Sequence, residues 1–306
     1  MLRKCYDAYG LVVESSFELP ELDVAIASSA SADVVVDVSP ARFPVPAISG
    51  SELPPPLVVY DSPTFAFRVD GGRRIEVWEG EGWDREFTRA VLLGRGLAIA
   101  LYQRGDWPLH VSAVVVGDGV WLFGGRSGAG KSTMAALLHV WFGLPLVSDD
   151  SGVVRFNGDQ TWFSAASRAI RLLPDALPHT FGQTGRAENL GAPIPSIDHK
   201  VRVRLASRLS SRQFPVRGLV MLDDLTSGEE ARVRVLRGAR ALEAIRLSMY
   251  RPWLGQNMCS AAATLKFCAD FHRRVPIYEF ARHRRFESSS RDLEPLRALM
   301  SAGEAG

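Results

Sequence analysis

The stretch from residue 125 to residue 133 carries the side chains and the spacing that hold a phosphate group. It reads Gly125-Arg126-Ser127-Gly128-Ala129-Gly130-Lys131-Ser132-Thr133 and matches the pattern G-x-x-x-x-G-K-[ST] in full. Glycines let the backbone wrap a phosphate with φ values that a side chain would resist, and a following helix directs free N–H groups at the anion. Lys131 is expected to reach the β- and γ-phosphates, and the Ser132 hydroxyl to ligate Mg²⁺. The motif therefore predicts binding of a nucleoside triphosphate, with ATP and Mg²⁺ as cofactors.

The segments on either side of this loop fit the strand and the helix that such a loop requires. Residues 120–123 form a short apolar run suited to a buried strand. After the loop, Met134, Leu137, Leu138 and Trp141 recur at i, i+3, i+4 and i+7 and so mark one face of a helix. A glycine-rich turn that fits the pattern by chance is the alternative, and the flanking elements argue against it.

A first pair of carboxylates follows the predicted helix. Residues 144–147 read as another short strand, which ends in Ser148-Asp149-Asp150. Because only one helix and one strand separate Asp149 from Lys131, the chain brings the pair close to the loop. Carboxylates at that place suit Mg²⁺ binding or the activation of an attacking hydroxyl. We favour this role over a pair that merely caps a helix or a turn.

A second pair of carboxylates competes with the first. Residues 218–222 are an apolar run that ends in Asp223-Asp224, and this has the form of a Walker B element, which holds Mg²⁺ in ATPases. An ordinary strand that ends in a turn is the bland alternative. Both pairs cannot form the principal metal and base site, so the choice between them decides the function.

The elements that position these residues divide the chain in two. Residues 1–84 read as a β-rich domain, with β-prone runs at 11–13, 32–38, 57–60, 65–69 and 74–78 separated by prolines and by Asp70-Gly71-Gly72. This domain serves either substrate recognition or packing alone. Residues 85–306 form the second domain, in which 83–105 reads as a helix. Residues 109–116 then form a hairpin with 120–123 through Gly117-Asp118-Gly119.

Composition limits the classes of partner. The chain has 306 residues, 46% hydrophobic and 23% charged, and a net charge of +2, which is too small to indicate nucleic acid or an acidic membrane surface. Its three cysteines, Cys5, Cys259 and Cys268, lack metal-ligand spacing and cannot all pair. Nothing at the N-terminus resembles a signal peptide, and the apolar stretches are shorter than a membrane span. We therefore expect a soluble, cytoplasmic protein.

At this point the residues resemble a known family. The segments LHVSAVVV, GRSGAGKST and PLVSDD resemble the C-terminal domain of HPr kinase/phosphorylase, a bacterial protein-serine kinase. They resemble more closely the stand-alone HPr-kinase-like proteins encoded beside ribosomal-peptide maturation enzymes, including those of lasso peptides. The likeness continues in residues 170–176, 233–250 and 275–280, and more weakly in Tyr9-Gly10-Leu11.

The resemblance implies an α/β fold with a P-loop kinase core of the HPr kinase and phosphoenolpyruvate carboxykinase type, preceded by a smaller β-rich domain. It implies that Asp150 is the catalytic base and that Asp149 is a metal or orienting ligand. His110 matches the family's active-site histidine, with a strand-start cap as the alternative. Arg171 is a candidate for charge stabilisation or else a solvated strand arginine. A surface position is favoured for Lys200 over a role in phosphate binding.

One departure from the family bears on the reaction. Ala169 stands where the HPr enzymes have a glutamate that helps to hold magnesium, which argues against phosphorylase activity. The leading hypothesis is an ATP- and Mg²⁺-dependent kinase that phosphorylates a serine on a peptide or small protein, most simply a lasso-type precursor. The alternative is a P-loop ATPase or nucleotide switch that uses Asp223 and Asp224. Because the HPr enzymes are hexamers, a homo-oligomer is possible.

Overall fold

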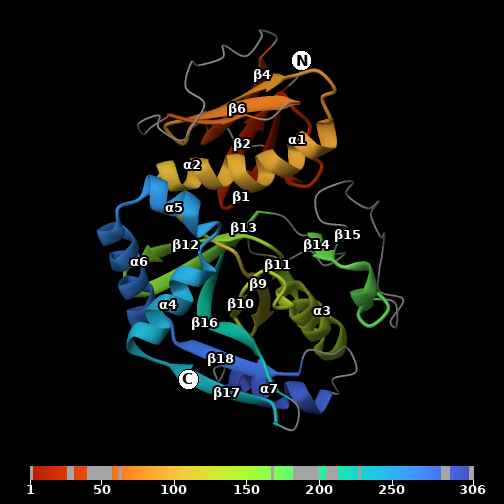
Figure 1. The fold of residues 1–306 in the computed structure, drawn as a ribbon, viewed down its shortest axis with the longest axis vertical. Coiled ribbons are helices and arrows are strands. Elements are labelled where there is room, and N and C mark those ends of the chain that lie inside the picture. Colours follow the sequence, from red (N-terminus) through yellow and green to blue (C-terminus); the bar gives the residue numbers. More distant parts are fainter. Residues whose placement is uncertain are drawn as a thin grey trace.

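Two large β-sheets with a helical segment between them dominate the described part of the chain (Figure 1). The structure is a computed structural model. It describes residues 3–25, 31–39, 57–61, 64–166, 169–181, 200–204, 213–226, 229–283 and 290–302. The fold is mixed α/β, as the sequence predicts. No helix within these ranges is long and apolar enough to cross a lipid bilayer.

The first sheet is built from the N-terminal segment. Its strands are β1 (Lys4–Ala8), β2 (Leu11–Ser15), β3 (Asp23–Val24), β4 (Val34–Ser39), β5 (Leu57–Asp61), β6 (Phe65–Asp70) and β7 (Arg74–Glu79). They lie in the order β3-β1-β2-β4-β7-β6-β5, and only the pairs β2–β4 and β4–β7 are parallel among those described. The five predicted runs are confirmed as β2, β4, β5, β6 and β7. The strands β1 and β3 were not predicted, because each carries charged residues and too few apolar ones.

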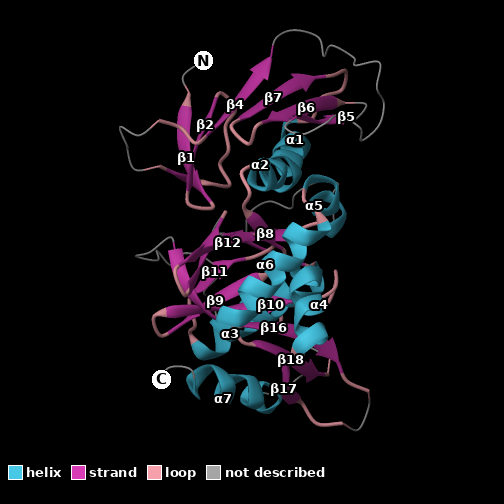
Figure 2. Cartoon of the chain, turned by 90° about the vertical axis from the view of Figure 1, so that its left-hand side faces the viewer, coloured by secondary structure: helices cyan, strands magenta, loops and turns pink. Residues whose placement is uncertain are grey.

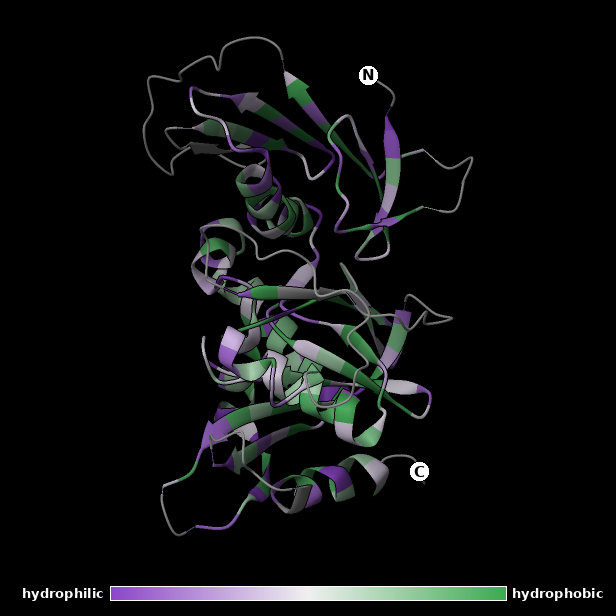
Figure 3. Ribbon diagram, turned by 90° about the vertical axis from the view of Figure 1, so that its right-hand side faces the viewer, coloured by the Kyte–Doolittle hydropathy of each residue, from purple (hydrophilic) through white to green (hydrophobic). Residues whose placement is uncertain are grey.

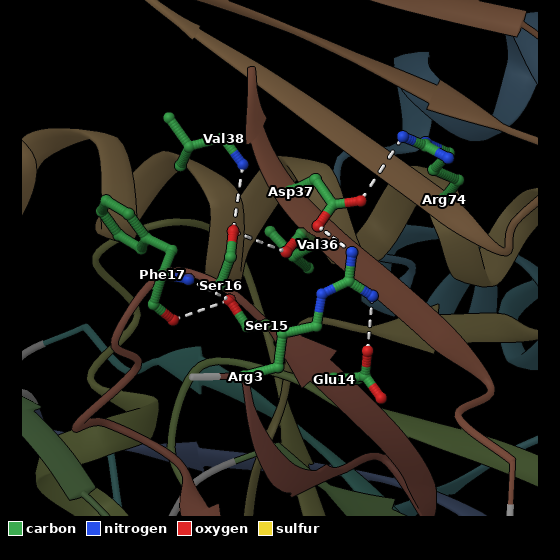
Figure 4. Close-up of polar contacts among 9 residues, drawn as sticks. All are labelled: Arg3, Glu14, Ser15, Ser16, Phe17, Val36, Asp37, Val38 and Arg74. Atoms are coloured by element: carbon green, nitrogen blue, oxygen red, sulfur yellow. Dashed lines mark hydrogen bonds and ion pairs between the residues drawn. The ribbon is translucent and has the colours of Figure 1, made fainter. Parts of the chain in front are cut away.

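Ionic and polar contacts join neighbouring strands of this sheet (Figure 4). Arg3 donates to Glu14 at 2.6 Å and to Asp37 at 2.9 Å, and Arg74 lies 3.4 Å from the other oxygen of Asp37. Because Arg3 and Arg74 are half-exposed, water screens these ion pairs and they contribute little to stability. The energy of this sheet therefore comes from its other face, where alternate residues such as Phe67 are fully buried.

A long helical segment covers that buried face. It comprises α1 (Arg85–Val91), a π-helical turn η1 (Leu92–Gly96) and α2 (Leu97–Gln103), which confirms the predicted helix. Asp84 caps it by accepting from the backbone of two residues in the first turn. Six of the seven residues of α2 are buried, and a helix that is apolar on all sides is a helix enclosed by protein.

The helical segment contacts both sheets. A Cβ on Gly96 would lie 3.7 Å from atoms of Phe67 and Ile75 in the first sheet, whereas the Tyr102 hydroxyl donates to the Tyr250 carbonyl at 3.0 Å in the second part. Buried residues of both sheets belong to one continuous core cluster. The boundary near residue 85 stays a prediction, because the helix that follows it serves both parts (Figure 2).

The second sheet carries the phosphate-loop segment. Its strands are β8 (Trp107–Leu109), β9 (Ser112–Val116), β10 (Gly119–Gly124), β11 (Leu146–Ser148), β12 (Gly152–Asn157), β13 (Gln160–Ala165), β16 (Gln213–Asp224), β17 (Arg232–Leu236) and β18 (Ile277–Arg282). The main path runs β11-β9-β10-β16-β13-β12-β8, with β18 beside β16 and β17 beside β18. The β9–β10 hairpin is confirmed, although β9 begins at Ser112 and not at 109. The backbone N–H of His110 donates to the Ser248 carbonyl and so leaves the ladder.

Helices cover both faces of this second sheet. They are α3 (Lys131–Phe142), α4 (Gly238–Ser248), α5 (Pro252–Met258), α6 (Ala261–Arg274) and α7 (Glu294–Ala302). Every residue of β10 is buried, and the strand alternates between two cores. Val120 and Leu122 pack in the core that contains α4 and α6, whereas Trp121 and Phe123 pack in the core that contains α3. Figure 3 shows this apolar interior in green.

A small ribbon stands beside α3. It pairs β14 (Ala169–Leu172) with β15 (Val201–Arg204), and the short helix η2 (Pro174–Ala176) follows β14. Ile170 and Leu172 are buried in the core that contains α3. The short helix η4 (Ser290–Leu293) leads into α7. Residues of β14, η2 and η4 line the cleft that is described below.

Candidate active site

The phosphate loop joins β10 to α3, as the sequence predicts. Gly125, Gly128 and Gly130 have φ values of 144°, 80° and 83°, a region that side chains resist. Gly130 is the N-cap of α3, so the first amides of the helix face the loop. The loop glycines are therefore required by the backbone itself, and the loop has the shape that holds an anion.

Lys131 folds back over this loop. Its side chain is almost fully buried, and Nζ donates to the carbonyl of Gly125 at 3.1 Å and of Arg126 at 3.3 Å. Burial lowers the pKa of Lys131, and the charges of Asp150 and Asp149 oppose that change. The ammonium group thus lies between the loop and the first carboxylate pair, where it can neutralise a phosphate.

Asp149 is buried behind the loop. Oδ2 accepts from the Arg171 backbone N–H at 2.6 Å, and Oδ1 accepts from the Ser112 hydroxyl at 3.1 Å. Burial and then the nearby charge of Asp150 raise the pKa of Asp149, while Arg171 and a hydrogen bond with Ser132 oppose the rise. Asp149 therefore lies near Ser132, in the first turn of the helix that follows the loop.

These two side chains fit a magnesium ion. Mg²⁺ prefers oxygen ligands, keeps several waters and is held in nucleotide sites by one or two protein groups together with phosphate oxygens. A hydroxyl and a carboxylate supply such a donor set here. Among the described residues no group of three or more His, Cys, Asp or Glu side chains could hold a metal ion without such help.

Asp150 has an unusual backbone and a cationic environment. Its φ of 87° is left-handed, which is rare for a residue with a side chain. Its carboxylate pairs with the Arg171 guanidinium, and its Oδ1 lies 3.4 Å from His110 Nδ1. Burial alone would raise the pKa of Asp150, but Arg171, His110, Lys200 and Lys131 together lower it. Asp150 is consequently ionised at neutral pH.

His110 is held between β8 and β9. Its Nδ1 lies 2.6 Å from the Asp150 carbonyl, and its ring meets the Tyr250 ring edge-on with centroids 6.0 Å apart. Burial lowers the pKa of His110, and the charge of Asp150 opposes this only in part. The imidazole is therefore neutral at pH 7. When Nδ1–H donates to the carbonyl, Nε2 is left as an acceptor.

A cleft of about 340 Å³ joins these groups. The polar residues of its lining are His110, Ser127, Lys131, Ser132, Thr133, Asp150, Arg171, Asp175, Lys200, Arg282, His283 and Asp292. The apolar residues of its lining come from α3, β14, η2 and η4, namely Met134, Leu137, Trp141, Leu172, Leu173, Ala176 and Leu293. Polar groups gathered in a partly apolar cleft of this size are typical of a small-molecule site.

The structure gathers the predicted residues unequally. Arg171, His110, Asp150 and the loop residues Ser127, Gly128, Gly130, Lys131, Ser132 and Thr133 line the cleft. Asp149 lies behind them. Asp223 and Asp224 lie at the exposed end of β16, outside the lining of the cleft as described. The catalytic and metal-binding roles stay predictions, but this placement favours the first carboxylate pair over the second.

Two further cationic residues line the cleft, and of these only Lys200 was considered from the sequence. Lys200, for which a surface position was favoured, is partly exposed and lines the cleft. Arg282 is 6% exposed and donates to the Ala129 carbonyl at 2.7 Å and to the Asp223 carbonyl at 3.2 Å. One feature of the sequence could have indicated Arg282. It stands at the end of a mostly apolar run, where a buried strand ends.

Comparison with known proteins adds little to this geometry. No protein-family model matches the chain, and no curated protein matches it. The solved structure of the Hpr(Ser) kinase/phosphatase from Coxiella burnetii is similar over 64% of this chain and 98% of that chain, with 13% identity and a TM-score of 0.33. A superposition of this extent does not establish a shared fold.

Proposed function

We propose that the chain is an ATP- and Mg²⁺-dependent kinase that phosphorylates a serine hydroxyl on a peptide or small protein. The observation that carries the proposal is the placement of an ionised carboxylate, Asp150, in the same cleft as the phosphate loop. Arg171 pairs with this carboxylate and His110 lies against the Asp150 backbone carbonyl, while Lys131 lies over the loop. A kinase needs these two halves together, because it must bring a hydroxyl in line with the γ-phosphate.

The chain's residues would divide the work of phosphoryl transfer. Transfer depends on positioning and on neutralising charge more than on covalent help from the protein. Lys131 and the loop amides would hold the phosphates, and Asp150 would orient the serine hydroxyl and accept its proton. A carboxylate with a lowered pKa suits this role, since proton transfer is late in a loose transition state. Arg171 would hold Asp150 and balance charge on the transferred group.

Ser132 and Asp149 would hold the magnesium ion. When bound, Mg²⁺ supplies neutralisation of the phosphate charge. Asp149 is suited to this because Ser112 and the Arg171 backbone fix the direction of both its oxygens. The pairing also explains why two adjacent carboxylates stand here, one toward the metal and one toward the substrate.

The resemblance supports a particular substrate. Stand-alone HPr-kinase-like proteins are encoded beside ribosomal-peptide maturation enzymes, so we propose a lasso-type precursor peptide that bears a serine. Ala169, at the position of a family glutamate, fits a forward kinase without phosphorylase activity. The first sheet would take part in recognising the peptide.

Intact-mass spectrometry of a serine-ending precursor peptide tests the proposal. Incubation with the protein, ATP and Mg²⁺ should add one phosphate. Asp150→Asn should abolish the addition and spare ADP binding. Asparagine tolerates the left-handed backbone, so this change removes the charge without adding strain. Asp223→Asn is the matched control, since it removes the same charge from the other pair, and it should keep the activity.

The alternative hypothesis gives the opposite result in the same experiment. A P-loop ATPase or nucleotide switch would release ADP without modifying the peptide, and Asp223→Asn would remove that release. Full phosphate transfer by the Asp150→Asn variant would show that another group accepts the proton.

A further inference from the structure

The strained residues of the structure gather at one place. Within the described ranges, the non-glycine residues with a left-handed backbone are Tyr9, Asp150 and Arg251, with φ values of 56°, 87° and 47°. The Tyr9 hydroxyl lies 2.8 Å from the hydroxyl of Ser151, the residue after Asp150. Arg251 follows Tyr250, whose ring contacts the candidate histidine. Strain of this kind persists only where the surroundings impose it, and it clusters at functional sites.

Tyr9 occupies a turn that is unusual for such a side chain. Strands β1 and β2 are joined by Tyr9 and Gly10 alone, with φ values of 56° and 74°. A two-residue hairpin turn with two positive φ values favours asparagine, aspartate or glycine at its first position. A buried tyrosine there has a conformational cost, so its side chain must make a compensating contact.

Every polar group of Tyr9 is bonded outside its own sheet. Its backbone N–H donates to the Ala165 carbonyl at 2.9 Å, its carbonyl accepts from Arg155 Nη1 at 2.6 Å, and its hydroxyl meets Ser151. The side chain is 2% exposed. A turn of the first sheet is thus anchored to β12, β13 and the segment that carries Asp150.

The anchor is rigid. Arg155 also binds Asp106 through two parallel hydrogen bonds of 2.9 and 2.6 Å, a geometry that fixes the guanidinium plane. On the other side, the turn packs closely against the Gln213 side chain, since a Cβ on Gly10 would lie 3.0 Å from it. The Ser151 backbone is held in turn, since its carbonyl accepts from the Ser148 hydroxyl at 2.8 Å. The Tyr9 hydroxyl therefore has a fixed place against the Asp150 turn.

We propose that Tyr9 is a positioning residue, which holds the turn around Asp150 in its left-handed conformation through the hydroxyl of Ser151. The inference rests on the proposed function in that Asp150 is taken as the base. It adds that the N-terminal sheet completes the active site, in addition to any role in binding the peptide. Without the Tyr9 hydroxyl, the Asp150 carboxylate would be held less firmly in line with the substrate hydroxyl.

Removing a single oxygen tests this. Tyr9→Phe should lower kcat for phosphate transfer about tenfold and leave KM for ATP unchanged, since small displacements of a positioned group are costly. Ser151→Ala should do the same, and the double variant should lose no more than either single one. Tyr6→Phe is the matched control. It removes a buried hydroxyl from the same hairpin, one that accepts from the Leu19 backbone N–H, and it should behave as wild type.

A second measurement is independent of activity. Hydrogen–deuterium exchange of a peptide covering residues 149–154 should be faster in Tyr9→Phe and unchanged in Tyr6→Phe. Unchanged kcat and unchanged exchange in Tyr9→Phe would overturn the positioning role. A wild-type protein that transfers no phosphate, but whose exchange responds to Tyr9→Phe, would refute the kinase proposal and leave the coupling between the sheets standing.

Discussion

Each carboxylate pair stands at the end of a strand of the second sheet, and the surroundings of the two pairs differ. Asp149 and Asp150 follow β11. Asp149 is buried behind the phosphate loop and Asp150 lines the cleft, and a backbone N–H, a hydroxyl, a guanidinium and an imidazole lie around the pair. Asp223 and Asp224 end β16 in an exposed position. Asp224 lies 3.6 Å from the Arg282 guanidinium, yet its side chain is 51% exposed.

The two pairs differ in how far their carboxylates are removed from water and in how firmly neighbouring groups orient them. Charges near water interact weakly, whereas the same charges in a closed site shift each other's pKa and orient their neighbours. For the first pair the two shifts have opposite signs, with the pKa of Asp149 raised and that of Asp150 lowered. Two adjacent carboxylates with divergent pKa values suit two different tasks.

The strongest test of the comparison is the magnesium requirement. Asp149→Asn should raise the Mg²⁺ concentration for half-maximal activity at least about tenfold, because an amide is a weaker ligand than a carboxylate. Asp224→Asn should leave the Mg²⁺ titration unchanged. An Mg²⁺ titration of steady-state phosphate transfer measures both. A larger effect at Asp224 would reverse the ranking of the two pairs.

The two carboxylate pairs should also differ in their contribution to the free energy of unfolding. Asp150→Asn should lower the free energy of unfolding by about 1–2 kcal/mol at pH 7, because Arg171 loses its charged partner. Asp224→Asn should change it by less than about 0.5 kcal/mol, as for exposed pairs. Because the pKa of Asp150 is lower in the folded state, its contribution is present above its ordinary value of 3.8 and is lost as the pH falls through the folded-state pKa. Urea unfolding at pH 7 and pH 3 checks both statements.

The second pair should act on the site only through Arg282. Arginine reaches the Ala129 and Asp223 carbonyls from two different nitrogens of its planar fork, and the single ammonium of lysine lacks that spread, so Arg282→Lys should weaken ADP binding about fivefold. Arg217→Lys, which alters an exposed ion pair with Asp118, is the control and should not change ADP affinity. Isothermal titration measures both. Equal ADP affinities of the wild type and Arg282→Lys would show that β16 does not influence the phosphate loop through Arg282.

The smallest effect concerns the pH profile. After burial, Arg171 is the main influence on the pKa of Asp150, and it lowers that pKa. Arg171→Gln should therefore raise the pKa and move the acid limb of kcat/KM to higher pH, because Asp150 must be ionised to accept a proton. Arg217→Gln should leave the limb in place. A limb that moved to lower pH would exclude Asp150 as the titrating group.

Local patterns predicted the parts of the site that lie close together in sequence. The phosphate loop, its strand and helix, and Asp149 and Asp150 were all found in this way, because a short chain segment fixes their geometry. Tyr9 and Arg282 were not found. Tyr9 and Ser151 are 142 positions apart, and a single sequence holds no information on which distant segments pair. Likewise, the two acidic pairs could not be ranked until the exposure of each strand end was known.

The buried helix α2 has a consequence for how the molecule comes apart. Residues as distant as Val13, Leu101 and Leu122 belong to one apolar cluster that runs from the first sheet through α2 to the second. Unfolding of either sheet would expose the apolar surface of α2 to water. We therefore expect thermal unfolding of the chain in a single cooperative transition. A chain cut near residue 85 would give two fragments, each with an exposed apolar surface that is complementary to the other. We expect these fragments to aggregate when separate and to reassociate when mixed.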